Sequence, residues 1–304
     1  MRQTVLITGA AGFAGGYMAS CLQDLEADMI IVGVDLHSPT DNPCERFYTL
    51  DLSDSNSVAE MIKKERPDWI IHLAGIFGSE NIPLTYQVNV LSTVALLESV
   101  RQYVPQSVFL AAGSAAEYGR VGSEKMPIRE DGPCRPVTPY GQSKYLATST
   151  IQYYHRVHNL CTMVVRPFQL IGRGVTDKLA PGAFAKRIME AVQAGKTEIQ
   201  VGNLESSRDF LDIHDAVRAI WMLCRHPKAG EIFNVCSSKP VRMGDLLDSM
   251  ITVASQELRP VMDPSRLRGK ADVNAVYGSY IKIKDHCGWE PTTGLIQSIR
   301  EMFA

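Results

Sequence analysis

The 304-residue sequence lacks the features that mark membrane proteins and nucleic-acid-binding proteins. No apolar run approaches the roughly 18 residues that a membrane-spanning helix needs. There is no block of Lys or Arg, and 31 basic side chains against 33 acidic ones leave a formal net charge of −2. Because polyanionic surfaces are bound through concentrated positive charge, we expect neither a nucleic acid nor a membrane as a partner.

Metal-binding and disulfide patterns are absent as well. The seven cysteines are scattered, with no C-x-x-C pair and no histidine at the spacing of a metal site. Met1-Arg2-Gln3 runs directly into an apolar segment, which predicts no signal peptide. We therefore expect a cytoplasmic protein with reduced thiols and no bound metal.

What is present is an ordinary globular composition, 45% hydrophobic and 21% charged, without internal repeats or low-complexity linkers. In the first half, continuous apolar runs alternate with segments of helical character, which indicates strands buried on both faces of a parallel sheet. The sequence predicts a Rossmann-type doubly wound α/β fold. The predicted strands lie at 4–8, 29–34, 69–74, 107–112 and 161–166. One predicted helix follows the first strand and ends at residue 25, and three more span about 56–65, 89–102 and 141–157.

The regular alternation weakens after Pro167. We predict a first lobe over residues 1–167, and a smaller α/β lobe over 168–304 that packs directly on it. The predicted strands of the second part lie near 199–201, 232–235 and 274–277, and its predicted helices near 182–194, 214–226, 243–254 and 294–303.

A glycine-rich turn joins the first strand to the first helix. Gly9, Gly12 and Gly15 are spaced G-x-x-G-x-x-G rather than G-x-G-x-x-G, and they allow backbone N–H groups to approach a pyrophosphate. Asp35 ends the second strand, where a carboxylate can bind ribose hydroxyls and repel a 2′-phosphate. These residues favour NAD(H), with NADP(H) as the alternative. Close packing of the glycines and a solvated Asp35 remain open as another interpretation.

Three polar groups predict acid–base chemistry. Tyr140 and Lys144 are four residues apart, on one face of a predicted helix. A tyrosine, with its ordinary pKa of about 10, needs a neighbouring cation to exchange protons near neutral pH. Ser114 follows a strand at the carboxyl edge of the sheet, where ligands bind in this fold. The three residues are therefore our catalytic candidates, acting on a carbonyl or carbinol oxygen beside a nicotinamide.

Together these motifs resemble the extended short-chain dehydrogenases/reductases of the NAD-dependent epimerase/dehydratase family, which act on nucleotide sugars. The resemblance covers nearly the whole chain. Its second half is most similar to the branch of GDP-mannose 4,6-dehydratases and GDP-4-keto-6-deoxy-mannose reductases. The residues that carry the resemblance are Gly9, Gly12, Gly15, Asn89, Ser114, Tyr140 and Lys144, with the segments 72–75, 166–168, 202–204, 208–215 and 233–238.

The resemblance implies a role for each matching residue. Tyr140 would be the general acid/base, Lys144 would bind the nicotinamide ribose and lower the tyrosine pKa, and Ser114 would orient the sugar C4 oxygen. Asn89 would assist structurally or as a proton relay, and Arg208 would bind the substrate diphosphate. The implied cofactor site comprises Gly9, Gly12, Phe13, Ala14, Gly15, Asp35, Asp51, Leu52, Leu73, Ala74, Gly75, Asn89, Tyr140, Lys144 and Pro167. The implied substrate site comprises Ser114, Ala115, Tyr140, Gln169, Arg208 and Arg268.

The resemblance also implies how the chain is organised. Residues 1–167, with a contribution from about 207–235, would bind NAD(P), and 168–304 would mainly bind the nucleotide-diphosphate sugar. A homodimer through the helices at 89–102 and 141–157 is implied too. Two positions depart from the family pattern, because Gln169 replaces an Asn and the segment after Arg268 carries one extra residue.

A third departure bears on the reaction. The dehydratases of the family carry a carboxylate two residues after the Ser or Thr, where this chain has Ala116. Glu117 is displaced by one residue, which on an extended segment would turn it to the opposite side. We predict a 4-ketoreductase similar to GDP-4-keto-6-deoxy-mannose reductase, and a UDP-sugar 4-epimerase with tightly bound NAD is the alternative. A 4,6-dehydratase and a non-catalytic nucleotide sensor rank below both.

Overall fold

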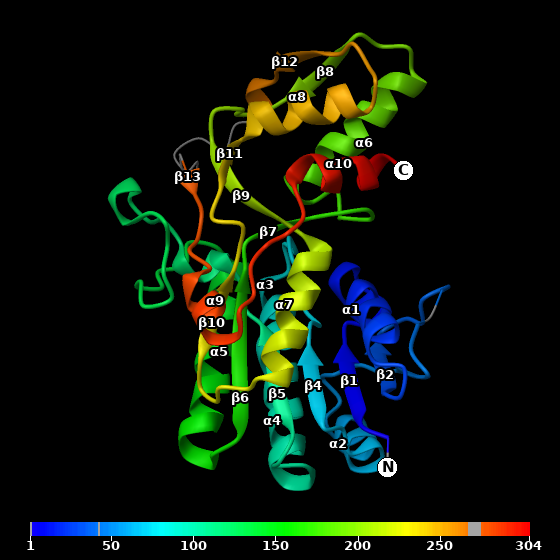
Figure 1. Cartoon of the computed structure of the whole chain (residues 1–304), viewed down its shortest axis with the longest axis vertical. Helices are drawn as coiled ribbons and strands as arrows, with labels where there is room; N and C mark the ends of the chain where they lie inside the picture. Colours follow the sequence, from blue (N-terminus) through cyan, green and yellow to red (C-terminus); the bar gives the residue numbers. More distant parts are fainter. Residues whose placement is uncertain (1, 42, 267–274) are drawn as a thin grey trace.

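The structure, a computed structural model, describes residues 2–41, 43–266 and 275–304. Figure 1 shows a larger lobe built on a sheet, with a smaller lobe above it. The strands of the larger lobe are β1 (Thr4–Thr8), β2 (Ile30–Asp35), β3 (Arg46–Thr49), β4 (Trp69–His72), β5 (Val108–Ala112), β6 (Cys161–Pro167) and β10 (Ile232–Val235). They are all parallel, in the order β10-β6-β5-β4-β1-β2-β3, which confirms the predicted doubly wound fold.

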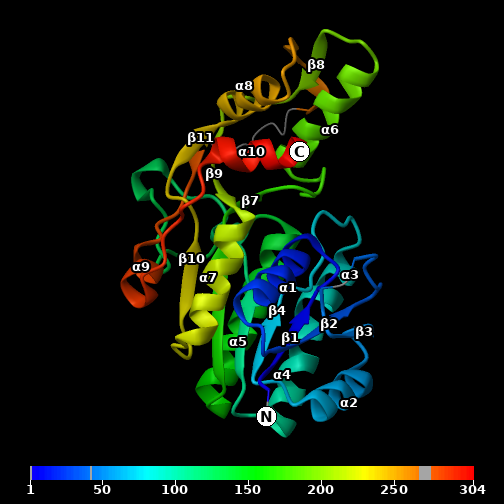
Figure 2. The ribbon, with the colours of Figure 1, turned by 45° about the vertical axis from the view of Figure 1, so that its right-hand side comes forward.

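Helices cover both faces of this sheet, which explains why its central strands are mostly apolar on both sides. Along β1, Val5 and Ile7 pack into one helical layer and Leu6 into the other, and all five residues are buried. One layer consists of α1 (Phe13–Leu25) and α7 (Ile213–Arg225), and the other of α2 (Ser55–Glu65), α4 (Ser92–Tyr103) and α5 (Pro139–His158) (Figure 2). A short helix, α3 (Ile82–Tyr86), and a π-helical turn, Gln87–Leu91, precede α4.

The smaller lobe has a core of its own. Ile171, Phe184, Leu246 and Ile299 belong to this apolar cluster, which is separate from those of the larger sheet. One sheet contains β7 (Gln169–Ile171), β9 (Ser207–Asp212), β11 (Pro240–Arg242) and β13 (Ala275–Val276), and a parallel pair contains β8 (Glu198–Val201) and β12 (Arg259–Met262). Its helices are α6 (Ala180–Gln193), α8 (Met243–Val253) and α10 (Leu295–Phe303).

The chain crosses between the lobes more than once. After β9 in the smaller lobe, α7 packs on α1, and β10 pairs with β6 at the edge of the larger sheet. The short helix α9 (Ile281–Cys287) then lies beside β10. Of the predicted strand at 274–277, β13 covers Ala275–Val276, while Asn274 lies outside the described residues.

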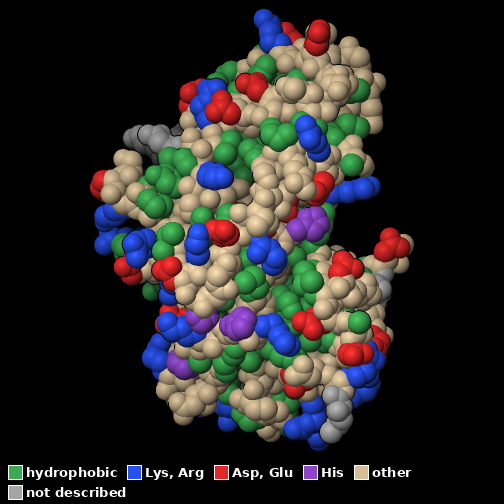
Figure 3. Space-filling model, viewed as in Figure 1, with side chains coloured by type: hydrophobic (Ala, Val, Ile, Leu, Met, Phe, Trp, Pro, Cys, Tyr) green, Lys and Arg blue, Asp and Glu red, His purple; other side chains and the backbone are tan. Residues whose placement is uncertain are grey.

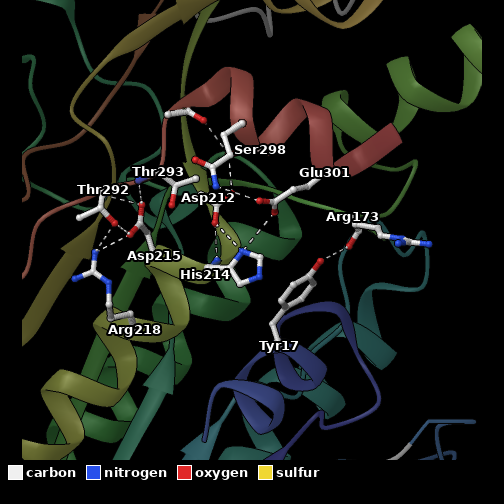
Figure 4. Close-up of polar contacts among 12 residues, drawn as sticks. Tyr17, Arg173, Asp212, His214, Asp215, Arg218, Thr292, Thr293, Ser298 and Glu301 are labelled. Carbon is white, nitrogen blue, oxygen red and sulfur yellow. Dashed lines mark hydrogen bonds and ion pairs between the residues drawn. The ribbon is translucent and has the colours of Figure 1, made fainter. Parts of the chain in front are cut away.

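A polar cluster joins the C-terminal segment to the start of α7 (Figure 4). Asp212 accepts hydrogen bonds from the backbone N–H of His214 at 2.8 Å and from the hydroxyl of Ser298 in α10 at 2.6 Å. Asp215 accepts from the N–H of Thr292 at 2.9 Å and from Arg218 at 2.6 Å. The N-terminus of α7 is thereby capped by side chains that also hold the last helix in place.

Figure 3 shows acidic and basic side chains interspersed on the face it draws. Among the described residues, no helix combines the length and the apolar character that crossing a bilayer requires.

Candidate active site

The glycine-rich turn borders a cleft of about 320 Å³ at the carboxyl ends of β1, β2 and β4. Gly9 has a φ of +72°, and a Cβ there would lie 2.7 Å from the backbone nitrogen of Ala74. A Cβ on Gly15 would lie 2.0 Å from the carbonyl oxygen of Gly9. Packing therefore requires both glycines, and because they lack side chains the backbone of the turn stays open to the cleft. The predicted residues that line it are Gly9, Gly12, Phe13, Ala14, Gly15, Asp35, Asp51, Leu52, Leu73, Ala74 and Gly75.

Asp35 lies at the end of β2, on the rim of this cleft. Its two carboxylate oxygens accept the backbone N–H groups of Ala11 at 3.0 Å and Leu36 at 2.7 Å. Each oxygen keeps a second lone pair for a ribose hydroxyl. A cradle of backbone groups with a carboxylate on its rim fits a dinucleotide. Five further residues line this cleft and were not predicted, because they belong to no recognisable motif: Leu36, Leu50, Ile76, Val88 and Ser92.

Ser114 and Tyr140 meet beyond the end of β5. Ser114 follows β5 and caps a 3₁₀-helical turn, Ala115–Tyr118, where its hydroxyl accepts the N–H of Ala116 at 3.1 Å. Thr138 caps α5 in the same way, so Tyr140 is the second helical residue. Burial raises the pKa of Tyr140 to about 12, although a hydrogen bond with Ser114 favours its phenolate form. The phenol is therefore protonated at neutral pH.

Lys144 lies one turn further along α5 and is buried. Its Nζ donates to the carbonyl oxygen of Ala112 at 2.9 Å, and it lies 3.1 Å from where a Cβ on Gly75 would be. Burial lowers the pKa of Lys144 to about 8. The pKa of Tyr140 is raised rather than lowered, contrary to the expected effect of Lys144, because burial of the phenol outweighs the other influences.

Asn89 connects the cofactor cleft to the helix that carries Tyr140. It lies in the π-helical turn, a form that often occurs at functional sites. Its Nδ2 donates to Ser143 Oγ at 2.9 Å and to the Ile76 carbonyl at 3.1 Å, while its Oδ1 accepts the N–H of Ile76 at 2.9 Å. Ser143 in turn donates to the carbonyl oxygen of Tyr140 at 2.8 Å. Asn89 therefore holds the loop after β4 against the start of α5.

The expectation of an extended segment after Ser114 is wrong. Residues Ala115–Tyr118 form a 3₁₀ turn because Ser114 and Glu117 cap it reciprocally. Glu117 is fully buried, and its carboxylate forms an ion pair with Arg166 at 2.9 Å. The side chain is thus held in the interior by a cation and is not a free base.

A second cleft, of about 390 Å³, lies between the lobes. Gln169 and Arg208, which the sequence predicts to bind substrate, line it, and Arg208 donates to the Ser207 carbonyl at 2.8 Å. Within the described part of the chain, no hydrogen-bond partner reaches the buried Oε1 of Gln169. Phe77, Lys178 and Arg187 also line the cleft and were not foreseen, because none belongs to a motif, and Asn203 from the segment 202–204 was given no role.

Several predicted site residues do not line the cleft expected for them. The lining of the first cleft lacks Asn89, Tyr140, Lys144 and Pro167, and the lining of the second lacks Ser114, Ala115 and Tyr140. Pro167 ends β6 and does not line the cofactor cleft. Ala115 begins the 3₁₀ turn and packs on the small apolar cluster around Tyr118, outside the lining of the second cleft. Arg268 lies outside the described residues.

Comparison with known proteins matches this arrangement. The sequence model of the NAD dependent epimerase/dehydratase family matches residues 5–236. The GDP-6-deoxy-D-mannose reductase of Pseudomonas aeruginosa is 30% identical, covering 100% of this chain and 97% of the relative. A UDP-glucose 4-epimerase of Lacticaseibacillus casei is 25% identical over 98% of this chain and 95% of the relative. The solved structure of RMD from Pseudomonas aeruginosa complexed with NADPH superposes with a TM-score of 0.87 at 29% identity, covering 99% of this chain and 97% of that one.

Proposed function

Because the chain belongs to the NAD dependent epimerase/dehydratase family, we propose that it is a nucleotide-sugar 4-ketoreductase that uses NAD(P)H. The substrate would be a GDP-4-keto-6-deoxy sugar, the class suggested by the full-length similarity to a GDP-6-deoxy-D-mannose reductase. The observation that carries the proposed direction of reaction is the pair of Ser114 and a protonated Tyr140, one helical turn before Lys144, which lies next to Gly75 of the cofactor cleft.

Reduction of a ketone needs an acid at the carbonyl oxygen, and Tyr140 is in the required state. A phenol with a pKa of about 12 is protonated over the whole physiological range. The Ser114 hydroxyl accepts from the Ala116 N–H, which leaves its own proton to stabilise charge on the same oxygen. Methyl-bearing Ala116 cannot act as a base, and Glu117 is paired with Arg166, so neither supports dehydration.

When bound, the nicotinamide supplies the hydride, and every other contribution comes from the chain. In our proposal Tyr140 gives its proton to the C4 oxygen, and Ser114 holds that oxygen in place. Lys144, with its pKa lowered to about 8 by burial, can hold the nicotinamide ribose and return a proton to Tyr140. Asn89 holds the loop at Ile76 against α5. The cofactor cleft, which Ile76 lines, is thereby kept in place relative to the helix that carries Tyr140 and Lys144.

We assign the substrate diphosphate to Arg208, whose guanidinium can bind two phosphate oxygens at once. Gln169 lies in the same cleft, and its buried Oε1 can accept a hydrogen bond from a substrate hydroxyl or N–H group. Arg268 remains a prediction from the sequence for a second diphosphate contact. In this scheme residues 1–167 with α7 and β10 hold the cofactor, and the rest of 168–304 mainly holds the nucleotide sugar.

We also propose a cofactor preference, a cellular location and an oligomeric state. Asp35 on the rim of the cofactor cleft favours NAD(H), with NADP(H) as the other possibility. A cytoplasmic homodimer stays our proposal for the assembly. The α4–α5 side carries exposed apolar residues that would be covered by such a dimer: Leu91, Tyr153 and Val157.

A UDP-sugar 4-epimerase is the second candidate, because the same three catalytic groups would serve it and a full-length relative carries that name. The first assay therefore mixes purified protein with NADH or NADPH and a GDP-4-keto-6-deoxy sugar, and separately with UDP-glucose. Stoichiometric loss of the 340-nm absorbance supports the reductase. Conversion of UDP-glucose to its C4 epimer without added cofactor would replace that proposal with the epimerase.

The catalytic assignment is tested by Tyr140→Phe. Loss of the phenolic proton should lower kcat about 10²- to 10⁴-fold while KM and NAD(P)H affinity change little. The matched control is Tyr153→Phe on the exposed side of the same helix, which should keep the wild-type rate. A Tyr140→Phe enzyme with unchanged kcat would refute the acid role.

A further inference from the structure

A buried ion pair between Glu117 and Arg166 is hydrogen-bonded to the backbone of Ser114. Glu117 belongs to the 3₁₀ turn after Ser114, and Arg166 to the neighbouring strand β6. Their side chains are 0% and 3% exposed, and Glu117 Oε2 accepts from Arg166 Nε at 2.9 Å. Two charges in the protein interior are costly unless the geometry of the pair satisfies both of them. Such a pair is weak evidence for stability alone, so its position beside the reacting groups calls for another explanation.

The second carboxylate oxygen of Glu117 holds the two elements that carry the reacting groups. Oε1 accepts the backbone N–H of Ser114 at 2.9 Å and the hydroxyl of Thr148 at 3.1 Å. Thr148 lies one turn beyond Lys144 on α5. A single carboxylate therefore ties the residue that orients the substrate oxygen to the helix that provides the proton.

We propose that Glu117 and Arg166 are positioning residues for the C4 reaction, which fix Ser114 relative to Tyr140 and Lys144. The inference rests on the proposed function, because it presupposes that these three groups act on one substrate oxygen. Neither Glu117 nor Arg166 touches the substrate in this scheme. Both act through Ser114 and through α5.

The pair is anchored on its other side as well. Arg166 Nη1 donates to the hydroxyl of Tyr118 at 3.1 Å, and the guanidinium lies over the Tyr118 ring, 4.7 Å from its centre. The Tyr118 hydroxyl donates to Asn234 Oδ1 at 2.7 Å, and Asn234 Nδ2 donates to the carbonyl of Ile128 at 3.0 Å. Ser114 is thus connected through buried polar groups to β10, so the ion pair is rigidly placed.

The Glu117 charge also acts on the acid itself. Burial raises the pKa of Tyr140 and lowers that of Lys144, and the Glu117 carboxylate raises both. Arg166 on β6 and Cys134 before α5 also interact electrostatically with this carboxylate, and Tyr118 is hydrogen-bonded to Arg166. Removing the negative charge should therefore lower the pKa values of Tyr140 and Lys144. For reduction, the pH above which the rate falls would then move to a lower value.

The test uses the full-length enzyme with E117Q and with the double variant E117Q/R166M. The single variant leaves a buried cation unpaired and can lose stability, whereas the double variant removes both charges and is expected to stay folded. We expect kcat to fall about 10- to 100-fold in both, with KM within about threefold, because displaced reacting groups slow the chemical step. The alkaline limb of the rate profile should move to lower pH in E117Q, which loses only the carboxylate charge. The double variant loses one charge of each sign, so its alkaline limb should move less.

The matched control is E65Q. Glu65 is equally buried, with 0% side-chain exposure, and pairs with Arg46 at 2.7 Å on β3, at the opposite edge of the sheet. This variant should lose stability without changing kcat or the pH profile. The positioning role is overturned if the folded double variant keeps the wild-type kcat, or if E65Q reproduces the losses of E117Q.

The two proposals can fail separately. If wild-type protein does not reduce a 4-keto sugar but epimerises UDP-glucose, the proposed function fails, and the variants are compared in the C4 epimerisation. If it does neither, the distance between the Ser114 and Tyr140 hydroxyl oxygens in crystal structures of wild type and double variant decides. An unchanged distance overturns the positioning role, and a lengthened one supports it.

Discussion

The two clefts of this protein differ in the atoms that line them. The cofactor cleft is formed largely by backbone, at the glycine-rich turn and at the ends of β1, β2 and β4. The cleft between the lobes is formed by side chains that come from distant parts of the chain, among them Phe77, Gln169, Lys178, Arg208 and Met243. A backbone cleft is damaged by adding atoms, whereas a side-chain cleft is damaged by removing them. This difference can be tested with paired variants.

The largest effect is expected from adding one methyl group to the backbone cleft. In Gly15→Ala the new Cβ would lie 2.0 Å from the Gly9 carbonyl oxygen, so the turn must shift. We expect NAD(P)H affinity to fall about 100-fold and the free energy of unfolding to fall by about 2 kcal/mol. Fluorescence titration and thermal unfolding measure the two quantities.

Gly16→Ala is the control for that variant. A Cβ at Gly16 meets no atom within 4 Å, and alanine favours a helix more than glycine does. This variant should bind cofactor normally and gain about 0.5–1 kcal/mol of stability. If the two variants bind NAD(P)H equally well, the backbone does not define this cleft.

A smaller effect is expected from removing a side chain from the second cleft. Arg208→Met keeps the length of the side chain but loses the guanidinium, which should raise KM for the nucleotide sugar about 10- to 50-fold. NAD(P)H affinity should not change. Arg242→Met, at a surface ion pair of the same lobe, should keep the wild-type KM. Steady-state kinetics with nucleotide sugar and NAD(P)H measure these values. Equal KM values for the nucleotide sugar in the two variants would contradict the role of Arg208.

The smallest effect concerns pH and Lys144, whose Nζ lies next to Gly75 of the cofactor cleft. Burial lowers the pKa of Lys144 to about 8, so its ammonium is lost as the pH rises through that value. We expect kcat/KM for reduction to be flat below about pH 8 and to fall about tenfold per pH unit above it. In Lys144→Arg the guanidinium stays charged, so any residual activity should persist to higher pH. An alkaline limb at the same pH in both enzymes would show that another group titrates.

Local patterns were sufficient for much of the molecule. The apolar runs predicted β1, β4, β5 and β6, because strands covered by helices on both faces are largely apolar. Tyr140 and Lys144 could be placed on one helical face by their spacing alone. Part of the lining of the cofactor cleft was predictable for a similar reason, because the glycine-rich turn follows β1 and Leu73, Ala74 and Gly75 follow β4.

Elements set by distant contacts could not be predicted. The strands β7, β11 and β13 have only two or three residues, too few to show a period. The segment after Ser114 was expected to be extended, yet it forms a 3₁₀ turn capped by Ser114 and Glu117. The Glu117 carboxylate of this turn pairs with Arg166 on β6, 49 residues away in the chain. Phe77 packs edge-on against Tyr140, with ring centres 5.0 Å apart, and no motif marks it.

By itself the sequence determined the sheet and the turn that fits a dinucleotide, and it singled out Ser114, Tyr140 and Lys144 as the candidate reacting groups, because each depends on residues close together in the chain. Only the tertiary structure decided how those groups are held and ionised. The pKa of Tyr140 depends on burial and on the carboxylate of Glu117, and the second cleft depends on two lobes meeting. Burial and long-range charge are properties of the packed molecule, so they exist only once the chain has folded.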